Sequence, residues 1–292
     1  MKSFFNKISF KFTFKRFLLA ILLIIVLVII GVVVDKTYEY YGTPEKLSEK
    51  YEKELKKKIE LDGKDVIKVQ KYDFNKDGVK DYIAITGKPK TDSISGNVEL
   101  YSSLDIIFFN NKSDEVLKYN TKKNFASNVT FDIYEDKDTE YIFVSDTSSG
   151  NVAMIKLEEN KLIDIIKNSF GSNFKGYTID MSFDKEDENK LNITLDNYGK
   201  SYLPEDNKTY TLDFTEKNVD LEKYRQTYNL DRFTTFELKD INSDGVFELV
   251  TSQYMLYLYK EAEGMQANLG NVSITFKYKN GKYEFNKVNV EI

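Results

Sequence analysis

The 292-residue chain contains no cysteine, no histidine and no tryptophan, and it has only three prolines. Without cysteine it cannot form a disulfide, carry a thiol nucleophile or hold the lipid of a lipoprotein anchor. Because histidine is missing as well, Ser-His-Asp triads and the usual zinc sites are excluded. We therefore expect that the chain is not an enzyme. The alternative that stays open is a cell-envelope hydrolase that uses a pair among the 47 Asp and Glu residues.

Charge is absent from one long segment near the N-terminus. Residues 17–34 form an uninterrupted apolar run of 18 residues, Gly31 included, which is within the range of about 17–25 for a membrane-spanning helix. A cleaved signal peptide has a shorter apolar region, of about 7–15 residues, and ends in small residues. Here the run ends in Gly31-Val-Val-Val-Asp35, whose β-branched residues suit a signal peptidase poorly. We therefore predict an uncleaved transmembrane signal-anchor helix at 17–34.

Acidic residues are also absent from the first 34 positions, whereas five basic residues precede the apolar run. These are Lys2, Lys7, Lys11, Lys15 and Arg16. The positive-inside rule predicts a single-pass protein of the cell membrane, with a cytoplasmic N-terminus and an extracellular C-terminal part. Beyond these five cations the chain carries 37 basic and 47 acidic residues, a net charge of −10. We expect no nucleic-acid partner, because nucleic-acid binding depends on basic residues that neutralise phosphates.

The residues that follow the predicted span, 35–60, indicate a juxtamembrane helix or stalk. Thr43 is a suitable N-cap, and Pro44 suits the first helical position. Apolar residues recur every four positions, at Leu47, Tyr51, Leu55 and Ile59. This narrow stripe predicts a short amphipathic helix that packs on its own protein. In the alternative interpretation the stripe contacts a partner, and the chain is an accessory subunit of a surface or sporulation complex.

From residue 61 to residue 292 the pattern changes to strands. Segments rich in β-branched and aromatic residues are separated by clusters of turn residues, and no helical period like that of the stalk appears. The predicted strands include 81–86, 104–109, 141–144, 272–276 and 283–285. The sequence therefore predicts a mainly β extracellular domain over 61–292, with a basic cytoplasmic tail at 1–16.

Two short loops in this domain share one pattern. Oxygen-bearing side chains stand at positions 1, 3, 5 and 9 of each loop, and a glycine stands at position 6. These side chains are Asp73, Asn75, Asp77 and Asp81 in the first loop, and Asp240, Asn242, Asp244 and Glu248 in the second. The spacing suits Ca²⁺, a hard cation that takes about 6–8 oxygen ligands, so we predict two calcium sites. A plain Asp/Asn/Gly turn without metal is the alternative.

The residues after the glycine distinguish these loops from EF-hands. Position 12 is Ala84 in one loop and Thr251 in the other, whereas an EF-hand has a bidentate Glu there. The acid comes at position 9 instead, and a predicted strand follows. This arrangement resembles the calcium loops of FG-GAP and VCBS repeats, the blades of integrin-type β-propellers. The resemblance implies that Val79 and Val246 add their carbonyl oxygens to the side-chain ligands.

A weaker internal repeat extends the pattern. Segments 132–144 and 184–194 are similar to the two loops with their following strands. Aligning Asp81, Glu140, Asn189 and Glu248 gives spacings of 59, 49 and 59 residues. Units of this size predict a β-propeller-like domain of about four blades. The two inner copies lack the glycine, so we expect no metal there. For function, we predict a calcium-rigidified surface that binds a protein or glycan ligand in adhesion or scaffolding.

Overall fold

The computed structural model describes residues 44–136, 139–187, 189–214, 224–228, 232–259 and 266–291. The chain divides into two compact units, 1–58 and 59–292. The predicted cytoplasmic tail and the predicted membrane span at 17–34 lie outside the described residues. Within the described ranges, no helix is long and apolar enough to cross a membrane.

In the first unit, helix α2 (Pro44–Lys56) confirms the helix predicted after the span. The helix begins at Pro44, where the fixed φ suits a helix and the missing N–H leaves no bond unmade. Lys56 pairs with Glu52 one turn earlier, at 2.6 Å. This lysine also places a positive charge at the negative end of the helix dipole. In the predicted apolar stripe, Leu55 is buried.

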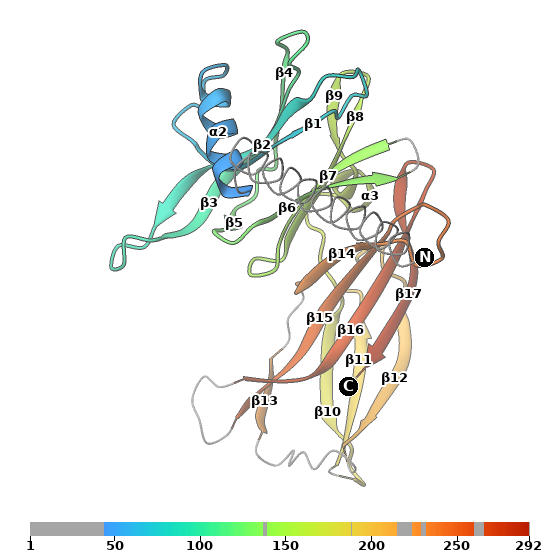
Figure 1. The fold of residues 1–292 in the computed structure, drawn as a ribbon. Helices are drawn as coiled ribbons and strands as arrows, with labels where there is room; N and C mark the ends of the chain where they lie inside the picture. Colours follow the sequence, from blue (N-terminus) through green and yellow to red (C-terminus); the bar gives the residue numbers. More distant parts are fainter. Residues whose placement is uncertain are drawn as a thin grey trace, which may run out of the picture. The chain divides into compact units, whose positions relative to one another are not determined.

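The second unit is mainly β, as predicted, and its strands form four antiparallel sheets that follow one another along the chain (Figure 1). Sheet A contains β1 (Asp65–Tyr72), β2 (Asp81–Thr91), β3 (Val98–Phe109), β4 (Val116–Asn120) and β5 (Phe125–Ala126). Sheet B contains β6 (Thr130–Asp136), β7 (Thr139–Asp146), β8 (Asn151–Glu158) and β9 (Lys161–Asp164). Sheet C contains β10 (Thr178–Phe183), β11 (Lys190–Asp196) and β12 (Asp206–Asp213). Sheet D contains β13 (Tyr224–Tyr228), β14 (Thr235–Lys239), β15 (Glu248–Tyr259), β16 (Gln266–Lys279) and β17 (Lys282–Glu291).

Each sheet is built largely as a meander, in which consecutive strands pair side by side. The orders are β1-β2-β3-β4, β6-β7-β8-β9 and β10-β11-β12. In sheet D, β14, β15, β16 and β17 pair in succession, and β13 also pairs with β15. Tight turns make this order possible. Between β16 and β17, for example, Asn280 and Gly281 both have positive φ, 51° and 82°, as a two-residue hairpin turn requires.

The predicted internal repeat corresponds to these four sheets. Asp81 and Glu248 are the first residues of β2 and β15. Glu140 is the second residue of β7, and Asn189 immediately precedes β11. Each aligned position therefore lies at the start of the second strand of a meander. No closed barrel or propeller is detected in the part of the chain that the structure describes.

Helix α3 (Ile165–Phe170), between β9 and β10, is a short helical segment within the mainly β domain. Six residues are too few to show a period of about 3.6, so the sequence pattern does not reveal this helix. The Asp164 carboxylate caps its first turn by accepting the N–H of Lys167 at 3.1 Å. The helix ends at Gly171, where φ is 81° and the N–H bonds to the Lys167 carbonyl.

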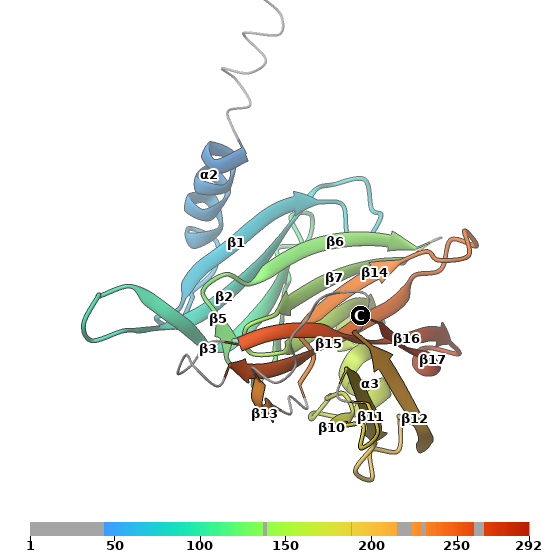
Figure 2. The ribbon, with the colours of Figure 1, turned by 90° about the horizontal axis from the view of Figure 1, so that it is seen from below.

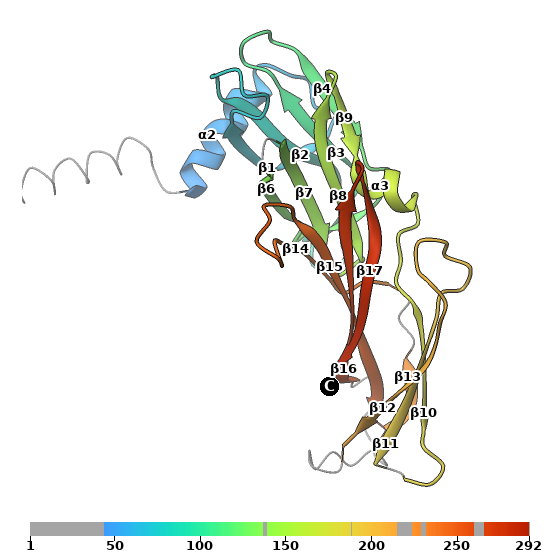
Figure 3. The ribbon, with the colours of Figure 1, turned by 90° about the vertical axis from the view of Figure 1, so that its right-hand side faces the viewer.

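Sheet B lies between two hydrophobic clusters. Ile142 and Val144 belong to a cluster shared with sheet A, whereas Tyr141 and Phe143 belong to one shared with sheets C and D and α3. Because successive side chains of a strand point to opposite faces, this alternation buries both faces of β7. Figures 2 and 3 show the strands of sheet B between those of sheet A and those of sheet D. Each fully buried apolar side chain in such a strand contributes about 1.5–3 kcal/mol.

Candidate metal loops

The two predicted calcium loops occupy equivalent places in their sheets. Loop 1 (73–81) connects β1 to β2, and loop 2 (240–248) connects β14 to β15. Both backbones enter the left-handed region twice, at the fourth and sixth positions. In loop 1, Lys76 and Gly78 have φ values of 56° and 85°. In loop 2, Ser243 and Gly245 have φ values of 57° and 78°. The two loops are therefore conformational copies of each other.

The side chains of loop 1 fold back onto its own backbone. The Asp73 carboxylate accepts the N–H of Asp77 at Oδ1 and the N–H of Gly78 at Oδ2, both at 3.0 Å. Asn75 Oδ1 accepts the same Asp77 N–H at 3.2 Å. Asp77 Oδ1 accepts the N–H of Val79 at 2.9 Å. Three of the predicted side-chain ligands, at the first, third and fifth positions, therefore gather around one turn.

Loop 2 repeats these bonds atom for atom. Asp240 accepts the N–H groups of Asp244 and Gly245, both at 3.0 Å. Asn242 accepts the Asp244 N–H at 3.2 Å, and Asp244 Oδ1 accepts the Val246 N–H at 2.8 Å. The amide of the third residue also donates to the carboxylate of the fifth, at 3.1 Å in loop 1 and 2.9 Å in loop 2. Because two distant segments reach the same geometry, the spacing itself determines that geometry.

The ninth position of each loop is a buried carboxylate. Asp81 has no exposed surface. Its Oδ1 accepts the N–H of Asn111 at 2.9 Å. Its Oδ2 is buried and no hydrogen bond of normal geometry from the described residues reaches it, although the N–H of Phe74 is near enough to the carboxylate to lower its pKa. Glu248 is 4% exposed and accepts the N–H of Ile241, the second residue of loop 2, at 3.0 Å. Loop 1 therefore contains a buried oxygen of the kind that a bound cation satisfies.

Electrostatic repulsion within loop 1 also favours a bound cation. Burial raises the pKa of Asp81 above its usual 3.8, and the nearby carboxylates of Asp77 and Asp73 raise it further. The N–H of Asn111 and, to a smaller extent, the N–H of Phe74 oppose these effects and lower the pKa of Asp81. Two unit charges ~4 Å apart repel by about 4 kcal/mol at an effective dielectric of roughly 20. A cation among these carboxylates would replace that repulsion by attraction.

The donors of each loop are carboxylate, amide and carbonyl oxygens, which suit Ca²⁺ or Mg²⁺ rather than zinc or copper. Val79 and Val246 stand between the fifth and ninth positions, where the family resemblance places their carbonyl oxygens. Among the described residues, no group of three or more Asp and Glu side chains is arranged as a metal-holding cluster. Backbone N–H groups engage the carboxylates at the first and fifth positions. The loops fit calcium by chemistry, and metal binding stays a prediction.

Each inner copy of the repeat has an ammonium partner for one of its acids. In sheet B, Glu140 is 7% exposed and lies 2.9 Å from Nζ of Lys76, a residue of loop 1. The same ammonium lies 3.4 Å from Glu135. In sheet C, Asp187 pairs with Lys190 at 2.9 Å. Residues 137–138 and 188 of these copies lie outside the described residues.

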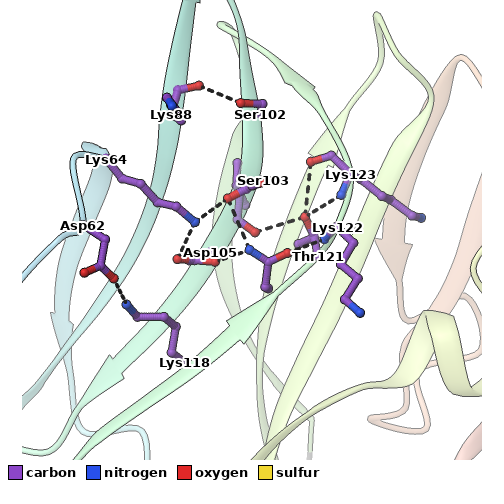
Figure 4. A network of polar contacts seen from close by, with 12 residues as sticks. Asp62, Lys64, Lys88, Ser102, Ser103, Asp105, Lys118, Thr121, Lys122 and Lys123 are labelled. Carbon is purple, nitrogen blue, oxygen red and sulfur yellow. Dashed lines mark hydrogen bonds and ion pairs between the residues drawn. The ribbon is translucent and has the colours of Figure 1, made fainter.

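Sheet A also contains a buried ion pair that the sequence pattern does not reveal (Figure 4). Lys64 Nζ lies 2.6 Å from Asp105 Oδ2, and it also donates to the carbonyl of Ser103 at 2.7 Å. The amide of Asn120 donates to Asp105 Oδ1 at 2.6 Å. Asp105 is 3% exposed, and both of its carboxylate oxygens are engaged. This network therefore joins β3 and β4 to the segment before β1, and both carboxylate oxygens of Asp105 hold protein groups in place.

No model of a known protein family matches this chain, and no curated protein matches it. The likeness to FG-GAP and VCBS repeats therefore depends on the residues of loops 1 and 2 and on the strand that follows each loop.

Proposed function

We propose that this protein is a membrane-anchored, non-enzymatic module outside the cytoplasm that binds Ca²⁺ in loops 1 and 2 and serves in binding, adhesion or scaffolding at the cell surface. The observation that carries the proposal is the duplicated loop. Asp73 and Asp240 accept the same pair of backbone N–H groups, and a glycine in the left-handed region follows in each case. Two oxygen-rich turns of the same geometry lie at equivalent places in two sheets. This duplication favours one kind of ligand for both loops over a separate, unrelated role for each.

Calcium in these loops would join the strands on either side of them. In loop 1, Asp73 directly follows β1 and Asp81 begins β2. In loop 2, Asp240 directly follows β14 and Glu248 begins β15. A cation held by both ends of a loop would fix the adjoining surface in one shape, which reduces the entropy lost when a ligand binds. Extracellular modules bind calcium with dissociation constants of about 10⁻⁴–10⁻³ M, a range that suits such a structural role.

The repeat is related to FG-GAP and VCBS proteins, in our proposal, at the level of the single unit. Each of the four meanders corresponds to one blade-like repeat, and the first and fourth repeats hold the metal loops. The acids at the second-strand starts, Asp81, Glu140 and Glu248, support this correspondence in sheets A, B and D. The predicted anchor at 17–34 keeps the repeats at the membrane.

Thermal unfolding of the full-length chain in detergent, with and without Ca²⁺, tests the proposal. The loop variants are Asp77→Ala and Asp244→Ala, and the matched control is Asp92→Ala. Asp92 accepts the N–H groups of Ile94 and Ser95 in an exposed turn after β2, so its loss removes similar turn bonds outside the loops. Calcium at 100 times its dissociation constant should add about 2.7 kcal/mol per site.

We expect calcium to raise Tm in the wild type and in Asp92→Ala to the same extent. Each loop variant should lose about half of that rise, because one of two sites is removed. If calcium leaves the midpoint of the wild type unchanged, both loops are ordinary turns and the calcium-dependent function is wrong.

A further inference from the structure

A groove lies between sheet B and strand β14. Its volume is about 420 Å³, and pockets of roughly 300–1,000 Å³ hold small ligands. One wall consists of alternate residues of β6, namely Thr130, Asp132 and Tyr134, together with Phe143 and Ser145 of β7. Because alternate residues of a strand share one side, this wall is a face of sheet B.

The opposite wall is the edge of β14. Four consecutive residues of this strand, 235–238, line the groove. Since successive side chains point to opposite sides, a groove that touches all four must run along the edge of the strand. In the described ranges, β14 pairs with β15 alone and β6 pairs with β7 alone. Figures 2 and 3 show β14 beside β6 and β7. An edge strand offers free N–H and C=O groups to an added strand.

The groove also contains polar groups that the protein leaves unengaged. Ser145 is 4% exposed, and its hydroxyl has no hydrogen-bond partner among the described residues. The carboxylate of Asp132 forms neither a hydrogen bond nor an ion pair in the same ranges. Glu237 supplies a second carboxylate, from β14, and pairs with Lys239 at the surface. Asp132, Tyr134 and Glu237 all line the groove. Burial raises the pKa of Tyr134, and Asp132 and Glu237 raise it further.

We propose that this groove binds an extended, positively charged peptide segment of a protein partner, which adds alongside β14 and places a lysine or arginine side chain between Asp132 and Glu237. The edge of β14 supplies main-chain hydrogen bonds, and the two carboxylates select for a cation. A glycan is disfavoured because Phe143 and Phe236 are only 2% and 7% exposed, and the ring of Tyr134 packs against Phe143 and Phe247. The proposal names the ligand class of the binding function proposed above and rests on that function for its surface location.

Loop 2 supports one wall of the groove. Phe247, the eighth residue of loop 2, packs edge-on against Tyr134, with ring centroids 5.6 Å apart and planes at 71°. Tyr134 in turn packs edge-on against Phe143, at 5.9 Å and 89°. A cation held by Glu248 would restrain the neighbouring Phe247 and, through it, Tyr134. Calcium should therefore strengthen peptide binding without contacting the peptide.

Isothermal titration of the full-length chain in detergent tests the proposal. The probe is the acetylated and amidated peptide Thr-Lys-Val-Lys-Thr, and its uncharged counterpart is Thr-Gln-Val-Gln-Thr. We expect the glutamine peptide to bind at least tenfold more weakly, because one charge-assisted hydrogen bond corresponds to about a tenfold change in affinity. Asp132→Asn and Glu237→Gln should each weaken binding of the lysine peptide about tenfold. Asp180→Asn, an exposed acid within β10 and outside the groove, is the matched control and should change nothing.

Three results would overturn the peptide assignment. They are equal binding of the two peptides, an equal loss in Asp180→Asn and Asp132→Asn, and binding of an N-acetylglucosamine oligomer that Asp132→Asn abolishes. The same titration in calcium and in EDTA separates this proposal from the calcium function. Peptide binding that is identical in both, with a Tm that calcium does not change, refutes the calcium function and supports the groove. A calcium-dependent Tm without peptide binding refutes the groove alone.

Discussion

The ammonium group of Lys76, in loop 1, lies 2.9 Å from a carboxylate oxygen of Glu140, on β7. Glu140 occupies in sheet B the place that Asp81 and Glu248 occupy in sheets A and D, at the start of the second strand. A lysine from the neighbouring repeat thus provides the positive charge that we assign to calcium in the outer repeats. At the equivalent position of loop 2 stands Ser243, which has no charge. Lys76 therefore links a candidate metal loop to the next sheet.

Lys76→Met should lower the stability of the protein at neutral pH, because Glu140 then keeps its buried charge without a partner. The hydrogen bond to Glu140 raises the pKa of Lys76 above its usual 10.5. An ion pair that raises the pKa of a lysine stabilises the folded protein fully below pH 10.5. This stabilisation is lost as the pH rises through the pKa that the lysine has in the folded protein. The difference in Tm between wild type and Lys76→Met should therefore be constant between neutral pH and about pH 10, where Glu140 is ionised and Lys76 is protonated, and shrink above that range. Lys185→Met, at an exposed turn position, is the control, and an equal loss there would contradict the prediction.

Calcium binding at loop 1 should weaken in acid, because Asp81 has a raised pKa and calcium needs the ionised form. The pKa of Asp81 is higher in the folded protein than the usual 3.8, so the folded state binds the proton more tightly than the unfolded state does. The calcium-free protein therefore loses stability as the pH rises from 3.8 through the pKa of Asp81 in the folded protein. Calcium offsets that loss, so the calcium-dependent rise in Tm should be largest near pH 7.5 and smaller near about pH 4.5. In Asp81→Asn, the stability of the calcium-free protein should no longer fall as the pH rises through this range. Equal calcium effects at both pH values in the wild type would count against Asp81 as a ligand.

Gly78→Ala should destabilise loop 1 through backbone strain alone. A Cβ at this position would have no heavy atom within 4 Å, whereas φ is +85°. Holding a residue with a Cβ in the left-handed region costs roughly 1–2 kcal/mol. Gly78→Asn should lose clearly less stability than Gly78→Ala, because asparagine tolerates the left-handed conformation. Urea denaturation at constant calcium measures both variants. Equal losses for Ala and Asn would show that the left-handed φ is not what the loop requires.

Gly176→Ala should break a buried contact between the segment before sheet C and sheet D. The side chain of Gln253 accepts the Tyr177 N–H and donates to the Tyr177 carbonyl, both at 2.8 Å. A Cβ on Gly176 would lie 1.9 Å from Gln253 Oε1, so both bonds must break. Two buried hydrogen bonds lost without replacement cost about 2 kcal/mol or more.

A double-mutant cycle with Gln253→Ala isolates this contact. The three atoms nearest to the added methyl group all belong to the Gln253 side chain and are absent in Gln253→Ala. In that background, Gly176→Ala should therefore cost much less than in the wild type. Additive losses in the double variant would mean that the glycine is required for another reason.

The sequence predicts loops 1 and 2 well because their hydrogen bonds are local. Asp73 bonds N–H groups only four and five residues further along the chain, and Asp240 does the same. Strands such as 141–144 are also predictable, since alternation and β-branched residues are properties of a few neighbouring positions. Helix α3 cannot be predicted in this way, because six residues do not complete two helical turns and therefore show no repeat.

The groove could not be predicted from the sequence. Asp132 lies in sheet B and Glu237 in sheet D, and no local pattern relates one to the other. Each of them, taken alone, is an exposed acid on a strand, which is ordinary for a protein surface. Their shared effect on Tyr134 becomes visible only once the two sheets are placed side by side.

By itself, then, the sequence determined the mainly β character, the positions of the second strands and the internal geometry of both loops. Only the tertiary structure decided that sheet B lies between sheets A and D, that Lys76 meets Glu140 and that β14 forms one wall of a groove. The physical reason is that turns and strands depend on directional hydrogen bonds among near neighbours. The hydrophobic effect that packs the sheets together is non-directional, so an apolar face in the sequence does not specify which other face will cover it.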